Sequence, residues 1–371
     1  MMKKTTLISI IFILFYLSYS FKNLPIFMLA ISLTTLLGFF IKKINKNFLI
    51  SIFSILITLS LFESFLFFFL NDKSIKIDNI NNFTSDIKYE KTFLGYQPKP
   101  GIHNYKIVTD GKVEIDKYYS IGKNKFRITP KINDFSKIRT LNFFGGSFAF
   151  GFGLNDDETM AFLIQKYFKE WKVNNYGVNG YGVHQMLAHI QKNPEILGDI
   201  NILMTVEGHV PSATCKRHSS FGTPKFVINY KKELVRSGNC QFGVLDKIPI
   251  PKIFGSIINR SEIKNIIFNI FNSENTFYNS KAIEIYLSIV SEINQITSDN
   301  NKTLIVGYMD SSTDLNRRII DSLLQKNIQL IDLSLDKNNE SYWLPDKHTS
   351  KAGNEKRVLI MQKKINEKFI K

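Results

Sequence analysis

The sequence predicts an α/β domain with a parallel sheet that is covered on both faces. From Ile138 onward, short apolar runs alternate with segments of helical periodicity, a pattern typical of parallel sheets packed between helices. The expected strands are 139–144, 173–178, 200–206, 302–308 and 328–333. The expected helices are 158–171, 183–193, 280–297, 313–325 and 350–369, the first of them capped by Asp156 and Asp157. Ligands bind at the carboxyl ends of the strands in such sheets, so we expect catalytic and ligand-binding residues in the loops that follow the strands.

Three apolar runs precede this domain, each close to the roughly 20 residues that cross a bilayer core. They cover 5–21, 24–41 and 48–70. Lysines precede the first run and separate the second from the third, which favours a cytoplasmic N-terminus. Three crossings would place everything after Leu70 outside the cytoplasm. An even number of spans, with a cytoplasmic C-terminal domain, is the alternative.

The chain is basic, with 48 Lys and Arg residues against 32 Asp and Glu residues and a net charge of +16. The positive charges form no long run and match no nucleic-acid module, so we expect no nucleic-acid partner. An anionic membrane surface or envelope polymer is the partner that such a charge favours, and a membrane protein partner is left open. A general bias of the sequence toward Lys, Asn and Ile would give the same charge.

The stretch between the anchor and the α/β domain divides into two parts. Residues 72–90 are polar and are expected to form a stalk, and 91–137 carry short strand and turn patterns of a small β-rich segment. We therefore divide the chain into 1–71, 72–137 and 138–371. Within the last part, 208–276 interrupts the strand–helix alternation and is expected to cover a substrate.

Two cysteines, Cys215 and Cys240, lie in this insertion. Neither they nor His184 and His189 have the spacing of a metal site, so we expect no metal. Outside the cytoplasm the two thiols could form a disulfide, worth roughly 3 kcal/mol in the chain-entropy model. Two unpaired thiols are the alternative.

The first candidate catalytic stretch begins at the end of the first expected strand. It reads Phe143-Phe144-Gly145-Gly146-Ser147-Phe148-Ala149-Phe150-Gly151. A short strand that runs into glycines and then a serine presents the hydroxyl at a tight strand-to-helix turn, where a nucleophile can be exposed. An ordinary turn serine is the alternative for Ser147.

Two further stretches lie at the ends of later expected strands. One is Asn175-Tyr176-Gly177-Val178-Asn179-Gly180-Tyr181-Gly182, directly before a helix. Free backbone N–H groups at such a place can hold an oxyanion, although a plain tight turn has the same composition. The other is Leu344-Pro345-Asp346-Lys347-His348, before the C-terminal helix. A serine early and an Asp-x-His late form a candidate Ser-His-Asp set, which is recognised by roles and not by chain order.

Together the three stretches resemble the blocks of the SGNH/GDSL hydrolases, over 138–371 with the insertion left out. The resemblance implies a flavodoxin-like three-layer α/β/α fold and ester or acyl-transfer chemistry without metal or cofactor. It implies Ser147 as nucleophile, His348 as general base and Asp346 as the group that orients the base. It also implies the N–H groups of Ser147 and Gly180 as oxyanion donors.

The sequence departs from the family pattern at three places. Gly146 replaces the family's Asp, which is not a triad member. The last block has one residue between Asp346 and His348 where two are usual, with Pro345 at the usual Asp position. The third block lacks its Asn, because the middle strand runs into Val206-Glu207-Gly208-His209. His209 is a candidate for the third oxyanion donor, and a structural or substrate-contacting role is the alternative.

These observations lead to two hypotheses. The first is a membrane-anchored, extracytoplasmic serine esterase or O-acyltransferase that acts on acyl groups, above all O-acetyl, of an envelope glycan or lipid. Whether water or a sugar hydroxyl accepts the acyl group is left open. The second is a non-catalytic envelope module that retains the fold for binding or assembly.

Overall fold

The computed structural model describes residues 83–109, 112–131, 139–241 and 278–369, with isolated helical positions between Asn47 and Leu61. The chain divides into two compact units, and these four ranges belong to the unit formed by Asn79–Phe242 and Phe277–Lys371. The predicted membrane spans, apart from those isolated positions, and residues 72–82 of the predicted stalk lie outside the described residues. No helix within the described ranges is both long enough and apolar enough to traverse a bilayer.

A five-stranded parallel sheet forms the centre of the described unit, as predicted. Its strands stand in the order β12-β11-β8-β6-β7. They are β6 (Arg139–Gly145), β7 (Trp171–Asn175), β8 (Ile200–Thr205), β11 (Thr303–Tyr308) and β12 (Leu330–Asp332). All six residues of β8 are buried, which fits the near-continuous apolar runs of a sheet covered on both faces.

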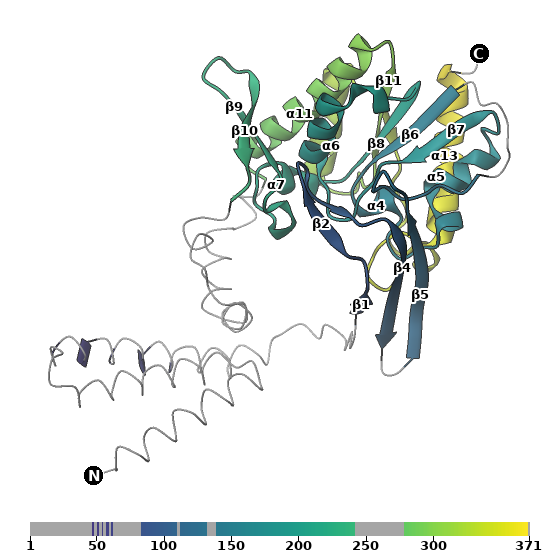
Figure 1. Cartoon of the computed structure of the whole chain (residues 1–371). Coiled ribbons are helices and arrows are strands. Elements are labelled where there is room, and N and C mark those ends of the chain that lie inside the picture. The colour runs from purple at the N-terminus through teal and green to yellow at the C-terminus, as the bar shows by residue number, and fades with distance from the viewer. Residues whose placement is uncertain are drawn as a thin grey trace. The chain divides into compact units, whose positions relative to one another are not determined.

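Helices cover both faces of this sheet, which gives three layers (Figure 1). On one face lie α6 (Val183–Lys192), α11 (Ser280–Asp299) and α12 (Asp314–Gln325). On the other lie α5 (Met160–Leu163) and α13 (Lys351–Phe369). Short 3₁₀ turns complete the connections at Asp156–Glu158, Ile164–Lys166, Pro194–Ile196 and Glu340–Tyr342. Four of the five predicted helices are present within two residues of their expected bounds.

The remaining prediction, a helix over 158–171, is wrong. The α-helix here is only α5, and it continues as the 3₁₀ turn Ile164–Lys166. The chain must turn back early because Trp171 already pairs with Arg139 in the sheet. The cap is also different, since Thr159 accepts the Phe162 N–H at the start of α5.

Asp156, predicted to cap that helix, has another role. Its carboxylate accepts hydrogen bonds from the Ser120 N–H and from Arg127 Nε, at 2.8 Å for Arg127. The Arg127 side chain is fully buried, and its other donors bind the carbonyls of Phe150, Gly151 and Leu154. A buried cation is tolerable when its donors are satisfied in this way. Arg127 therefore ties the loop after Phe150 to the segment that precedes the sheet.

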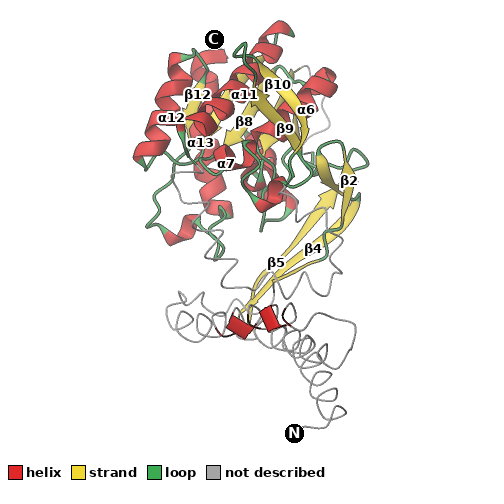
Figure 2. Cartoon of the chain, turned by 90° about the vertical axis from the view of Figure 1, so that its left-hand side faces the viewer, coloured by secondary structure: helices red, strands yellow, loops and turns green. Residues whose placement is uncertain are grey.

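That preceding segment is β-rich, as predicted, and belongs to the same compact unit as the sheet. Its strands are β1 (Phe83–Ser85), β2 (Tyr89–Thr92), β3 (Gly95–Pro98), β4 (Gly101–Thr109) and β5 (Lys112–Ile121). They form an antiparallel β1-β4-β5 sheet and a β2-β3 hairpin, and we call them the accessory strands. Figure 2 shows the long β4–β5 hairpin extending away from the helical layers. Where it meets those layers, Tyr105 and Tyr119 pack with Phe150 in a small core of their own.

The predicted insertion is described as far as Gln241. It begins with α7 (His209–Ala213) and the 3₁₀ turn His218–Ser220, and continues as the antiparallel pair β9 (Pro224–Ile228) and β10 (Leu234–Asn239). Cys215 and Cys240 are joined in a disulfide, the first of the two alternatives for these thiols. Residues 242–276 of the insertion lie outside the described residues, so its role as a substrate cover stays a prediction.

Candidate active site

Ser147 lies at the carboxyl end of β6, at the turn that the sequence predicts. Strand β6 ends at Gly145, and the short helix α4 (Ser147–Phe150) begins after a single intervening residue. Gly145 has φ +150°, and a methyl group there would lie 2.7 Å from the Met204 carbonyl oxygen, so the tight turn requires glycine. The Ser147 side chain is half-buried. Among the described residues, its hydroxyl and its backbone N–H have no hydrogen-bond partner, and both are available to a substrate.

Asp346 and His348 lie together in a tight turn after β12. The Leu344 N–H donates to the His348 carbonyl at 2.7 Å and closes the turn. Asp346 Oδ1 accepts the His348 backbone N–H at 3.1 Å, and its Oδ2 lies 3.0 Å from His348 Nδ1. The ring is turned so that Nδ1 and Oδ2 are at ion-pair distance without the alignment of a linear hydrogen bond.

The Asp346 carboxyl is ionised at neutral pH. Burial opposes its ionisation, but the His348 side chain, the His348 backbone N–H and the Tyr105 hydroxyl together hold its pKa below the usual value. An ionised carboxylate beside Nδ1 favours the tautomer in which Nδ1 carries the proton and Nε2 is free to accept one. The pair therefore has the electrostatics of a general base with its orienting group.

The imidazole of His348 rests on the turn that carries Ser147. Its ring lies 5.6 Å from the ring of Phe148 and 5.0 Å from that of Phe152, centroid to centroid. Phe148 is the next residue after Ser147, and the Phe152 N–H donates to the Ser147 carbonyl at 3.0 Å. No hydrogen bond joins the Ser147 hydroxyl to the ring. Catalytic hydrogen bonds of this kind often become short and aligned only in the complex with substrate. The fold thus brings the three predicted residues into one neighbourhood.

A buried arginine connects the region around Ser147 and His348 to the ends of the sheet strands. Arg357 of α13 donates to the carbonyls of Leu333 and Met309, beyond the ends of β12 and β11, and to the Thr349 hydroxyl. Its guanidinium also lies 5.5 Å from the ring centroid of Phe148. Burial lowers the pKa of Arg357 to about 9, so the side chain remains charged at neutral pH. This role could not be predicted from the sequence, because an arginine in an amphipathic helix is usually exposed.

The glycine-rich stretch after β7 packs against the serine turn. The Tyr176 N–H donates to the Phe143 carbonyl at 2.7 Å, and the Val178 N–H donates to the Gly145 carbonyl at 3.1 Å. Gly180 has φ +81°, a conformation that favours glycine, and its N–H donates to none of the described residues. The second predicted oxyanion donor therefore has a free N–H in the loop bound to the serine turn.

His209, the candidate third donor, begins α7 at the end of β8 and is buried. A methyl group on Gly146 would lie 3.1 Å from its Nε2 and 2.7 Å from the Tyr181 carbonyl oxygen. Gly146 is thus the point at which the serine turn, the glycine-rich stretch and His209 meet. Because two groups already occupy the space beside its Cα, no side chain fits there.

The accessory strands supply contacts that the sequence did not predict. Tyr96 of β3 donates its hydroxyl to the Asn179 carbonyl at 3.0 Å, and the Tyr181 hydroxyl donates to the Tyr96 carbonyl. The Tyr105 hydroxyl of β4 donates to Asp346 Oδ2 at 3.3 Å. Burial, and next the Asp346 charge, raise the pKa of Tyr105, so its hydroxyl stays a donor. One segment therefore holds both the glycine loop and the acid of the candidate triad.

We expect Tyr105→Phe to lower kcat about fivefold while KM stays near its original value. A hydrogen bond of about 1 kcal/mol to the orienting carboxylate is lost, and the packing of the ring is kept. Because this hydroxyl helps to lower the pKa of Asp346, its removal raises that pKa and moves the acid limb of kcat/KM to higher pH. Ester hydrolysis measured across pH checks both effects.

The matched control is Tyr118→Phe. Tyr118 stands on β5 and is 55% exposed, so the loss of its hydroxyl should change neither kcat nor the acid limb. Equal pH profiles for Tyr105→Phe and the original chain would contradict a positioning role for the Tyr105 hydroxyl.

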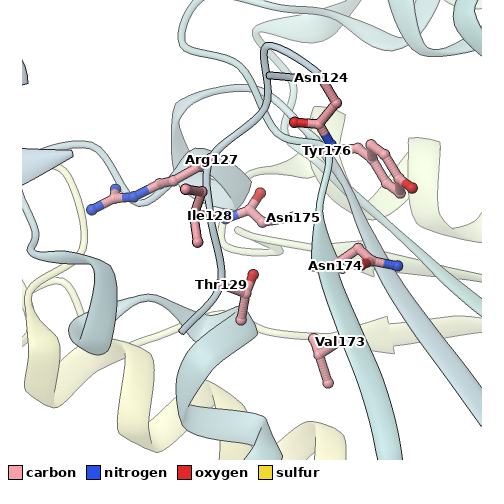
Figure 3. A pocket seen from close by; sticks show the side chains of 8 residues that line it. All are labelled: Asn124, Arg127, Ile128, Thr129, Val173, Asn174, Asn175 and Tyr176. Carbon is pink, nitrogen blue, oxygen red and sulfur yellow. The ribbon is translucent and has the colours of Figure 1, made fainter. Parts of the chain in front are cut away.

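A cavity of about 190 Å³ lies behind the serine turn, between the loop after β5 and the end of β7 (Figure 3). None of the predicted site residues lines it. Asn175, in its wall, binds the Ala149 carbonyl of α4 at 2.8 Å, and the Arg127 side chain is directed away from the other labelled residues. The contact from Asn175 makes this wall a support for α4, which carries Ser147.

Comparisons with known proteins returned similar solved structures only. No protein-family model matches the chain, and no curated protein matches it either. One similar structure is described as a member of the lipolytic protein G-D-S-L family from Veillonella parvula, 13% identical, TM-score 0.32, covering 62% of this chain and 98% of its own. The esterase EstA from Pseudoalteromonas is 10% identical, TM-score 0.35, covering 63% of this chain and 100% of its own.

A family two carbohydrate esterase from Clostridium thermocellum is also 10% identical, with a TM-score of 0.36, covering 63% of this chain and 65% of its own. Structures described as G-D-S-L lipolytic proteins and esterases are therefore among the matches. The arrangement of Ser147, Asp346 and His348, and not these similarities, carries the function proposed below.

Proposed function

We propose that the protein is a serine esterase or O-acyltransferase with Ser147 as its nucleophile. The observation that supports this most strongly is the Asp346–His348 pair, 3.0 Å apart, seated on the turn that exposes the Ser147 hydroxyl. Two free N–H groups in the same turn and in the glycine loop supply the donors that an acyl-transfer site needs.

The reaction would proceed in two halves. Ser147 Oγ attacks the acyl carbonyl while His348 Nε2 takes the hydroxyl proton, and the carbonyl oxygen becomes an oxyanion. The intermediate collapses, the ester C–O bond breaks, and the alcohol leaves with the proton that His348 held. Water or a second hydroxyl then attacks the acyl-enzyme by the same steps in reverse, which releases the acid or the new ester and restores Ser147.

We place this reaction outside the cytoplasm, on an acylated envelope glycan or lipid, in a chain anchored by its three N-terminal apolar runs. The disulfide between Cys215 and Cys240 supports an oxidising compartment. The net charge of +16 favours an anionic membrane surface or polymer as the place of action. O-acetyl is the acyl group that we favour, with water and a sugar hydroxyl both as candidate acceptors.

Covalent labelling of the full-length chain with a fluorophosphonate tests the proposal. Such probes react with an activated serine hydroxyl, so we expect a single adduct, and mass spectrometry of peptides should locate it on Ser147. A chain that stays unlabelled under conditions that label a known serine esterase would support the second hypothesis, a non-catalytic module that retains the fold.

A further inference from the structure

A buried chain of hydrogen bonds leads from the helix layer to His209. The Tyr286 hydroxyl of α11 lies 2.9 Å from the Thr205 hydroxyl at the end of β8. The Thr205 hydroxyl lies 3.1 Å from His209 Nδ1. Tyr286 and Thr205 are completely buried and His209 is 7% exposed, so water does not compete for these bonds.

The direction of the protons in this chain follows from their number. Tyr286 and Thr205 each carry one hydroxyl proton, and among the described residues the Tyr286 hydroxyl has no acceptor other than Thr205. If Tyr286 donates to Thr205, then Thr205 donates to His209 Nδ1, and both hydroxyl protons are used. The opposite direction would leave the Tyr286 proton buried without an acceptor, which costs about 1–3 kcal/mol. The first arrangement is therefore the stable one.

This arrangement determines which ring nitrogen of His209 carries hydrogen. Because Nδ1 accepts from Thr205, the proton of the neutral ring must be on Nε2. The ring is neutral, since burial, and next the nearby Arg217, lower the pKa of His209 to about 3. Nε2 faces Gly146, the residue before Ser147, because a methyl group on Gly146 would lie 3.1 Å from it.

We propose that His209 donates its Nε2–H to the oxyanion formed on attack by Ser147, with the tautomer set by Tyr286 and Thr205. The proposal rests on the function proposed above and adds a side-chain donor to the N–H groups of Ser147 and Gly180. A neutral imidazole suits this role, because it offers a hydrogen bond where charge develops and brings no charge to be buried beforehand. The glycine at 146 is part of the same arrangement, since a side chain there would displace the ring.

Two variants of His209 in the full-length chain test the donor. We expect His209→Met to lower kcat for p-nitrophenyl acetate about 10²-fold with little change in KM, the usual effect of losing one oxyanion donor. We expect His209→Gln to recover much of that loss, because its amide nitrogen can reach the position of Nε2. Equal activity of the Met variant and the original chain would overturn the proposal, as would equally low activity of the Met and Gln variants.

A variant of Thr205 tests the tautomer without changing His209. Thr205→Val keeps the shape of the side chain and removes the proton donor to Nδ1, so we expect kcat to fall about tenfold. In ¹⁵N NMR spectra the original chain should show the His209 proton on Nε2, and the variant should show a mixture of tautomers. The control is Thr297→Val, which removes another buried hydroxyl, bonded to the Ile293 carbonyl within α11, and should change neither kcat nor the spectrum.

The outcomes also separate this inference from the proposed function. Loss of activity in Ser147→Ala together with full activity in His209→Met would reject the oxyanion role and leave the serine esterase intact. Hydrolysis that persists in Ser147→Ala would reject both. A His209 proton found on Nδ1 in the original chain would contradict the tautomer and, with it, the donor.

Discussion

Replacing Ser147 with alanine is expected to lower kcat for ester hydrolysis by about 10⁶-fold, the size of effect seen when a serine hydrolase loses its nucleophile. The change removes one oxygen from a half-buried side chain that makes no hydrogen bond to a described residue, so the fold should be unaffected. Release of p-nitrophenol from p-nitrophenyl acetate by the purified full-length chain measures the loss.

The control for this experiment is Ser311→Ala. Ser311 follows β11, at the same edge of the sheet, and its hydroxyl donates to Asp332 at 2.7 Å. We expect nearly unchanged kcat for it, because it contacts no member of the candidate triad. A Ser147→Ala chain that hydrolyses the ester at the rate of the control would exclude Ser147 as nucleophile.

Asp346→Asn is expected to lower kcat about 10⁴-fold, as in other triads in which the orienting carboxylate becomes an amide. The amide keeps an oxygen that can accept the His348 backbone N–H, so the turn should remain. It loses the negative charge that holds the proton on Nδ1, so the base presents the wrong nitrogen to Ser147. Steady-state kinetics near neutral pH measure the effect, with Asp310→Asn, which breaks an ion pair to Lys337, as a control that should stay active.

The same variant should also change how stability depends on pH. The pKa of Asp346 is lower in the folded chain than its ordinary value, so its ionisation stabilises the fold above that ordinary value. This contribution is lost as pH falls through the folded pKa, and Asp346→Asn lacks it at every pH. The difference in free energy of unfolding between the two chains should therefore shrink on acidification, and urea titrations at several pH values would show it. A difference that grows toward acid would contradict a lowered pKa.

The sequence was sufficient to predict those parts of the fold that depend on local pattern. The strand that becomes β8 is apolar throughout and is buried on both sides, and α11 has a clear amphipathic repeat with Asn279 as its cap. The helix expected over 158–171 failed because helical periodicity competes there with pairing of Trp171 in the sheet, an interaction between residues distant in sequence. Local propensity cannot weigh such a contact.

The residues of the candidate site likewise divide into those that local sequence pattern predicts and those that it does not. Ser147, Asp346 and His348 could be predicted because each lies in a short stretch whose turn and residue types are visible in sequence. Tyr105 could not, because 241 residues separate it from Asp346, and its pattern is that of any tyrosine in a strand. His209 was a candidate from its position after β8, but its proton-bearing nitrogen depends on Tyr286, a residue of a distant helix.

The tyrosines of the accessory strands give the β-rich segment a larger part in the enzyme than that of a spacer. Tyr96 braces the loop of Gly180, and Tyr105 braces the acid of the pair. Under the proposed function, a competent fragment must include these strands and cannot begin at Ile138, where the α/β pattern begins. Under the proposed function, the site is complete only when the accessory strands are packed against the α/β domain, so folding of both segments is a condition for activity.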